Sequence, residues 1–499
     1  MHMIKIVNDP VKKIHNFWNN IHFHPTDAIE DDWGRRILDQ VAADNAAETV
    51  RMYAMLEDIV SMGENGELKY DFTLNDLRLD YMMEKGFKIF LSYNFIPPCI
   101  ASDSGSTSTV CKNKTRYKGK VITTSPPKDY ALWEEVCCQY TKHIVERYGE
   151  DTVAEWDLQC YNEPDISLFF MTGMDESAES QKLRLENYCK LYKHFANGVM
   201  RVSPKLRVGG PALAHSHEFM DGFLAFVRRE NLRLDFISLH TYGTTPKQLN
   251  DETLPFHAEN TLTKHLALTT IIDKHYPDGI EVIVDEWGAA TAGFYNREEC
   301  PKLMLREDSR YAAYFGKMIK AYADKDINIS KMMICLSGQH EMVEDFSGFR
   351  NFFTLNFIRK PIYNAYVLAR KLHDNLLNAE YDNSDMSVMA TKSDDDKYAV
   401  LISYASENFD KDLPNVDETI GISNISGERD IKIWCIDEKH VNPYMMSVRN
   451  GWDKFTPKQI DQLRKEGELV PMEECKVNAD GTLKINVSFT NNALVLVEF

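Results

Sequence analysis

Short apolar segments alternate with longer amphipathic segments along the first three quarters of the chain. Eight of the short segments are predicted to be β-strands: NFWNNI (16–21), TVRMY (49–53), FKIFLSY (87–93), EWDLQCY (155–161), LRVGG (206–210), DFISLH (235–240), EVIVDE (281–286) and KMMICLS (331–337). Eight strand and helix units in succession predict a parallel sheet closed into a (β/α)8 TIM barrel over residues 15–372. An open doubly wound sheet is the alternative, but such sheets usually carry a glycine-rich loop after the first strand, and no glycine precedes Gly34.

Two of the intervening helices have predictable ends. Apolar residues at helical spacing run from Leu132 to Tyr148, and Gly149 is the expected C-cap. A second helix is predicted to start with Thr73 as its N-cap, to carry an apolar stripe formed by Leu74, Leu77, Tyr81 and Met82, and to end before Gly86.

After about residue 373 the pattern changes to a period of two, with turn residues between the apolar runs. This predicts a C-terminal all-β accessory domain, a β-sandwich, over residues 373–499. The opening segment MIKIV has the same character, so residues 1–14 are predicted to form a strand that joins the sandwich. The overall class is therefore α/β with an all-β addition.

Long irregular insertions follow several predicted strands, near residues 94–128, 165–180, 240–260, 288–307 and 338–360. All lie where strands end and helices begin, which is the face that carries active sites in TIM barrels. The segment 101–128 holds six basic residues against one acidic residue. A solvated loop is favoured for it over a lid that contacts substrate.

Net charge and cysteine spacing exclude several classes of protein. A formal charge of -19 argues against nucleic acid or an anionic membrane as the main partner, and no apolar run is long enough for a membrane span. Ten cysteines without a C-x-x-C pair predict a reduced, cytoplasmic protein. Because Met1-His2 ahead of Met3 is typical of a cloning remnant, an export signal removed from this position stays an open alternative.

Two carboxylates end strands that face each other across the mouth of an eight-stranded barrel. Glu163, in YNEPD, ends the fourth strand, and Glu286, in VIVDEWG, ends the seventh. Cleavage of a glycosidic bond needs such a pair: one acid protonates the leaving oxygen, and the other attacks the anomeric carbon or activates water. Asp285 is expected to point away from the pair, because neighbouring strand residues face opposite ways.

The order of motifs resembles glycoside hydrolase family 39, the β-xylosidase and α-L-iduronidase family of retaining (β/α)8 glycosidases. The likeness rests on FWNNIHFHP, TVRMY, FLSYNFIPPCIAS, YNEPD, VGGPALA, DFISLHTYG and VIVDEWG in the barrel, and on HVNPYMMSVRNGWDKFTPKQIDQLRKEGEL beyond it. It implies that Glu163 is the general acid/base and Glu286 the nucleophile of a double-displacement mechanism. Retention in turn implies carboxyl groups about 5 to 5.5 Å apart.

The resemblance also implies a set of substrate-binding residues. Arg51 would support the nucleophile, Asn162 would bind the hydroxyl next to the anomeric carbon, and further contacts are expected from His240, Tyr242, Trp287, Glu341 and His24. Simpler roles remain open for three of them: a barrel ion pair for Arg51, a core histidine for His240 and core packing for Trp287.

The chain departs from the family pattern at three places. Tyr161 replaces the usual tryptophan before Asn-Glu-Pro, Met52-Tyr53 follows Arg51 where a histidine is usual, and the eighth strand, ICLSGQHEM, lacks its tryptophan. The glycone therefore stays open among xylose, arabinose, galactose, glucose and iduronic acid. A uronic acid would need a cation in the pocket, and the stretch from Lys112 to Lys120 is the evident source.

The leading interpretation is an exo-acting retaining glycoside hydrolase that cleaves oligosaccharides or glycosides, best labelled β-xylosidase-like, without a cofactor or metal. A carbohydrate-binding protein on a catalytically altered barrel is the second interpretation. A metal-dependent hydrolase with ligands near His22 and His24 is the third. A homo-oligomer is possible, since an acidic surface is compatible with a monomer or a tetramer.

Overall fold

The computed structural model describes residues 2–23, 29–109, 121–251, 257–291, 293, 295–325, 327–337, 342–407 and 411–499. The barrel strands are β2 (Asn20–Phe23), β3 (Thr49–Tyr53), β6 (Lys88–Tyr93), β9 (Asp157–Cys160), β10 (Arg207–Leu213), β11 (Phe236–Thr244), β12 (Glu281–Ala290) and β13 (Ile329–Leu336). Each pairs in parallel with the next, and β13 pairs with β2, so the sheet is closed. All eight predicted strands are confirmed, and so is the barrel.

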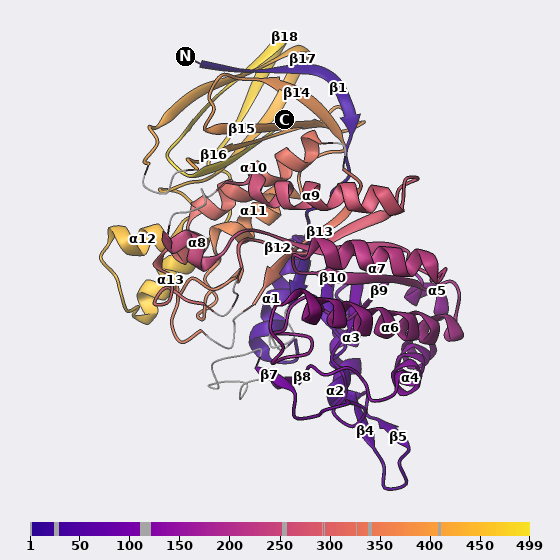
Figure 1. Cartoon of the computed structure of the whole chain (residues 1–499). Coiled ribbons are helices and arrows are strands. Elements are labelled where there is room, and N and C mark those ends of the chain that lie inside the picture. The colour runs from indigo at the N-terminus through magenta and orange to yellow at the C-terminus, as the bar shows by residue number, and fades with distance from the viewer. Residues whose placement is uncertain are drawn as a thin grey trace.

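Helices surround the barrel and return the chain from each strand to the next (Figure 1). They are α1 (Asp32–Ala43), α2 (Leu56–Ile59), α3 (Thr73–Glu84), α4 (Tyr130–Tyr148), α5 (Glu150–Val153), α6 (Ala178–Val202), α7 (His217–Arg229), α8 (Pro246–Asp251), α9 (Glu259–His275), the 3-10 turn η1 (Pro301–Arg306), α10 (Ser309–Asp324) and α11 (Pro361–Ala369). Two short hairpins, β4 (Val60–Met62) with β5 (Leu68–Tyr70) and β7 (Thr107–Thr109) with β8 (Val121–Thr123), extend the loops after β3 and β6.

Helix α4 follows its prediction, whereas helix α3 follows it only in part: it ends before Gly86 as predicted, but its N-cap and part of its apolar stripe differ. Gly149, with φ of 89°, ends α4 as expected. In α3 the N-cap is Phe72 rather than Thr73, and Leu74 and Leu77 are exposed. The buried face of α3 carries polar side chains that have partners instead: Arg78 pairs with Glu30, and Asn75 accepts from Tyr140. Met82 is buried and Tyr81 packs against the core, so the predicted stripe is wrong only at Leu74 and Leu77.

The C-terminal strands form one seven-stranded sheet with the N-terminal strand. It contains β1 (His2–Lys13), β14 (Asn375–Glu380), β15 (Met386–Lys392), β16 (Tyr398–Tyr404), β17 (Val416–Ile436), β18 (Glu473–Phe489) and β19 (Ala493–Glu498). Strand β1 pairs antiparallel with β14 and parallel with β17, so the sheet curls back on itself and encloses its own apolar core. The predicted all-β domain is confirmed, and its shape is that of a sandwich.

The accessory sheet packs directly on barrel helices α10 and α11 (Figure 1). At Gly316 on α10 the backbone lies against Ser403 of the sheet, and a Cβ atom there would clash with Ser403 Oγ, so only glycine fits without a shift. The helical excursion α12 (Pro443–Arg449) and α13 (Pro457–Glu466) reaches down to the loop after β13, where Leu463 packs with Phe346 and Ile358. None of the described helices has the length and apolarity needed to cross a bilayer.

Candidate active site

A layer of buried polar side chains fills the barrel above a small apolar plug of Phe90, Phe236, Ile283 and Met333. Arg51 on β3 is its centre: the guanidinium donates to Gln159 Oε1 at 2.7 Å and to Asn162 Oδ1 at 2.8 Å. It also lies 3.0 Å from Asp285 Oδ2 and 2.9 Å from Glu286 Oε1. One fully buried cation therefore orients both carboxylates and the amide beside Glu163.

Glu286 is held in its ionised form. It accepts a hydrogen bond from Arg51 at 2.9 Å and another from Tyr242 Oη at 2.7 Å. Burial by itself would raise the pKa of this carboxyl, but the positive charges of His240, His22, Arg51 and Arg350 hold the pKa well below its ordinary value.

Asp285 contradicts the expectation that it points away from Glu286. Its carboxylate contacts Arg51 and accepts from Gln159 Nε2 at 2.7 Å, inside the barrel. The pairing of β12 with β13 shifts register between Val284 and Trp287, so two successive side chains face inward. The simple alternation of a regular strand fails at this irregularity.

Glu163 sits on a tight turn at the end of β9. Tyr161 and Glu163 have φ of 66° and 44°, the left-handed conformation that costs about 1 kcal/mol or more for such residues. The turn is fixed because Glu163 N donates to Ala212 O at 3.0 Å, and because Asp165 accepts three backbone N–H bonds from residues 214–216. These bonds to neighbouring loops hold the strained turn in place. This turn positions the Glu163 carboxyl at the mouth of the barrel.

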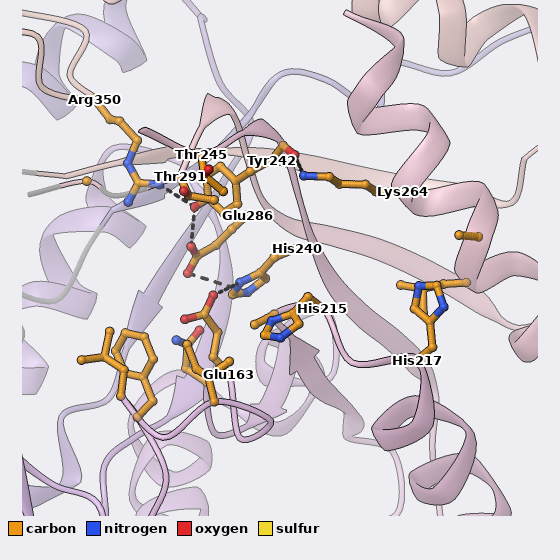
Figure 2. A pocket seen from close by; sticks show the side chains of 18 of the residues that line it. Glu163, His215, His217, His240, Tyr242, Thr245, Lys264, Glu286, Thr291 and Arg350 are labelled. Carbon is orange, nitrogen blue, oxygen red and sulfur yellow. Dashed lines mark hydrogen bonds and ion pairs between the residues drawn. The ribbon is translucent and has the colours of Figure 1, made fainter. Parts of the chain in front are cut away.

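His240 on β11 lies beside the two glutamates and contacts both of them (Figure 2). Its Nδ1 is 2.7 Å from Glu163 Oε1, and its Nε2 is 3.8 Å from Glu286 Oε1. Burial raises the pKa of Glu163, and the charges of Glu286 and Asp165 add to this, against the lowering effect of His240. The two carboxyl groups therefore have pKa values shifted in opposite directions, as an acid and a nucleophile require.

Arg350 completes the wall beside Glu286. It lies in the loop after β13, where Ser337 N donates to its carbonyl oxygen at 2.7 Å, and its Nη1 donates to Tyr242 Oη at 2.6 Å. Tyr242 thus accepts a hydrogen bond from Arg350 and donates one to Glu286. Arg350 therefore helps to orient the Glu286 carboxylate through the Tyr242 hydroxyl. Sequence reasoning missed Arg350, because an arginine in an irregular loop carries no periodic or motif signal.

A cavity of about 680 Å³ opens above these groups. Its described lining consists of Tyr53, Asn162, Glu163, Ile166, Leu168, Phe169, Ala214, His215, His217, His240, Tyr242, Thr245, Thr263, Lys264, Ala267, Leu268, Glu286, Thr291, Gly293 and Arg350. The structure therefore brings Asn162, Glu163, His240, Tyr242 and Glu286 into one pocket, with Arg51 directly beneath it.

The comparison with known sequences agrees with this geometry along the whole chain. The sequence model of glycosyl hydrolases family 39 matches residues 2–484. The chain belongs to this family. It is accordingly a glycoside hydrolase, and its substrates are glycosides.

Individual relatives of this family 39 chain are distant, and the beta-xylosidases match far more of it than the alpha-L-iduronidases do. A beta-xylosidase of Caldicellulosiruptor saccharolyticus is 26% identical over 92% of this chain and 89% of its own length. Human alpha-L-iduronidase is 24% identical over 46% of this chain and 34% of its own length. Among solved structures, a monomeric beta-xylosidase from Caulobacter crescentus superposes with a TM-score of 0.81 at 20% identity, covering 100% of this chain and 99% of that one.

Trp287 does not serve the pocket of this family 39 enzyme, which corrects the prediction of a sugar contact. Its side chain is fully buried on the outer side of β12, stacks on Phe315 and donates from Nε1 to Tyr366 Oη at 3.1 Å. Tyr161, which replaces the usual tryptophan, is also buried, and its hydroxyl donates to Phe169 O. The remaining two predicted contacts, His24 and Glu341, lie outside the described residues, as does the basic stretch 110–120.

Two groups of side chains at the site have spacings that a metal ion could bridge: Glu163 with His240 and Glu286, and His22 with Glu286 and Cys335. Both would share Glu286, whose carboxylate already accepts from Arg51 and Tyr242. The arginine charge next to this oxygen would repel a metal cation. A metal-independent reaction stays the prediction on these grounds.

Proposed function

We propose that this family 39 enzyme is an exo-acting, retaining glycoside hydrolase in which Glu286 is the nucleophile and Glu163 the general acid/base. The spacing of the two glutamates carries the proposal: an oxygen of Glu163 and an oxygen of Glu286 lie within 4.8 Å of each other. Retaining enzymes hold their carboxyl groups about 5 to 5.5 Å apart, whereas inverting enzymes need about 6.5 to 9.5 Å to admit water between them.

In the first step, the Glu286 carboxylate attacks the anomeric carbon while Glu163 gives its proton to the glycosidic oxygen. The carbon–oxygen bond to the leaving group breaks, and an ester links the sugar to Glu286. The raised pKa of Glu163 keeps this proton available, and the lowered pKa of Glu286 keeps the nucleophile charged.

In the second step, Glu163, now ionised, takes a proton from water as the water oxygen attacks the anomeric carbon. The ester bond breaks, Glu286 leaves as a carboxylate, and the sugar is released with its original configuration. Asn162 supports both steps: because its Oδ1 accepts from Arg51, its amide nitrogen is the atom available to donate to a sugar hydroxyl.

β-Xylosidase is the best single label for the activity, supported by the two beta-xylosidases that match about nine tenths of the chain. The test is hydrolysis of nitrophenyl β-xyloside, β-glucoside, β-galactoside and α-arabinoside, with the first-formed anomer followed by NMR. Wild type should release the β-anomer from the preferred β-glycoside. Glu286→Gln should lose at least about 10³-fold in kcat, while Glu84→Gln, an exposed glutamate on α3, should match wild type. An α-anomer as first product would contradict retention.

An acidic glycone is the second candidate, because the pocket holds a buried arginine. Arg350 lines the cavity with 7% of its surface exposed, beside Tyr242 and Glu286. Its guanidinium has the fork geometry that binds carboxylates. If the glycone is a uronic acid, an α-L-iduronide should be cleaved faster than a β-xyloside, and Arg350→Met should reverse the preference. Faster cleavage of the xyloside by wild type would exclude this candidate.

A further inference from the structure

The cavity extends well beyond the two catalytic carboxylates. Figure 2 shows Arg350 on one side of the two glutamates, and His215, His217 and Lys264 on the other side. The far part is formed by the loop after β9, the loop after β10 with the start of α7, and one face of α9. We call this part the outer arm; its lining residues from those elements are Ile166, Leu168, Phe169, Ala214, Ala267 and Leu268, with four polar residues named below.

The outer arm has an apolar interior and a polar rim. Phe169 and Leu268 are 7% and 4% exposed and form its walls. Of its four polar residues, His215, His217 and Thr263 are exposed, whereas the ammonium of Lys264 donates to Tyr242 O and points toward the catalytic groups (Figure 2). Leu168 at the mouth is 48% exposed, so a bound apolar group could cover it.

The lining of the outer arm differs from that of a usual site for a second sugar. A sugar ring usually needs polar groups along its length and an aromatic face beneath it. Phe169 offers an aromatic face, but no tryptophan lines the described cavity, and the other buried wall residue, Leu268, is aliphatic. Three of the polar residues, His215, His217 and Thr263, lie at the exposed rim, where the far end of a bound molecule would meet water.

The position of the acid decides which part of the substrate enters the outer arm. Glu163 protonates the glycosidic oxygen, so the leaving group lies next to Glu163. The outer arm begins there, because the loop after β9 carries Glu163 as well as the arm residues Ile166, Leu168 and Phe169. We propose that the outer arm binds an apolar leaving group, an alkyl or aryl aglycone rather than a sugar. This rests on the proposed function of Glu163 and Glu286, and it makes the enzyme a hydrolase of glycosides of apolar alcohols or phenols.

Alkyl glycosides of increasing chain length test this proposal, because primary alcohols from methanol to hexanol have similar acidity and the chemical step stays comparable. Each methylene fully removed from water strengthens binding about fourfold. Across methyl, butyl and hexyl β-xylosides, kcat/KM of wild type should therefore rise at least tenfold.

Leu168→Ser should reduce the rise from methyl to hexyl at least threefold. Leu183→Ser is the matched control, since Leu183 on α6 is also exposed, at 40%, but does not line the cavity; this variant should keep the full rise. A flat dependence on chain length would overturn the apolar arm and leave the hydrolase intact.

Calorimetric binding of the same glycosides to Glu286→Gln separates the two proposals. If wild type cleaves none of them but affinity for the variant rises with chain length, the outer arm is supported and the proposed β-xylosidase activity fails. Affinity that does not change with chain length, or no binding at all, counts against the outer arm.

Discussion

Replacing Arg51 by methionine should destabilise the barrel more than any surface change. The side chain is fully buried and contacts Asp285 and Glu286, which are 0% and 6% exposed. Methionine has a similar length but no charge, so Arg51→Met leaves two buried carboxylates without their shared cation. The loss of folding stability comes from those unpaired charges and not from a loss of side-chain volume.

The expected loss follows from the size of the barrel and the penalty for breaking a buried ion pair. Removing one partner of such a pair costs about 3–5 kcal/mol. A barrel of roughly 350 residues unfolds with an entropy of about 0.7 kcal/mol per kelvin, from about 2.1 cal/mol/K per residue. Arg51→Met should therefore lower the Tm by about 4–7 °C.

Differential scanning calorimetry of four proteins checks this prediction. Arg147→Met is the control, because Arg147 forms an exposed pair with Asp80 and such pairs contribute at most about 1 kcal/mol. Adding Asp285→Asn to Arg51→Met removes one of the unpaired charges and should recover at least about 2 °C. A Tm for Arg51→Met within about 1 °C of wild type, or no recovery in the double variant, would refute the reasoning.

Three further predictions concern the site. His240→Asn should move both limbs of the kcat/KM pH profile to higher pH, because the imidazolium of His240 lowers the pKa of Glu163 and of Glu286. A profile that does not move would show that His240 carries no charge. Glu163→Ala should cleave nitrophenyl glycosides at least about 100-fold better than alkyl ones, and azide should give a β-glycosyl azide by NMR; an α-azide would contradict retention. Trp287→Phe should lower the Tm by about 1–3 °C through the lost bond to Tyr366, with KM within twofold of wild type; a larger change in KM would place Trp287 in binding after all.

Most of the fold could be predicted from the sequence, because the spacing of apolar residues indicates which side of a strand or helix is buried. All eight barrel strands and the all-β domain follow from that period. The failure at α3 has a physical reason: Asn75 and Arg78 are buried with hydrogen-bond partners from distant segments, which no local pattern reveals. The unexpected direction of Asp285 has another, since a register shift between strands depends on both partners.

The sequence by itself determined the two glutamates, their places at the C-terminal ends of strands that face each other across the barrel, and the amide beside Glu163. Only the tertiary structure decided how those groups are tuned. Arg350 reaches Tyr242 from a loop beyond the last strand, and His240 bridges the carboxylates. The apolar outer arm is assembled from three separate loops and helices. Strand positions follow from local periodicity, whereas charges, pKa values and cavity walls arise from contacts between residues far apart in the chain.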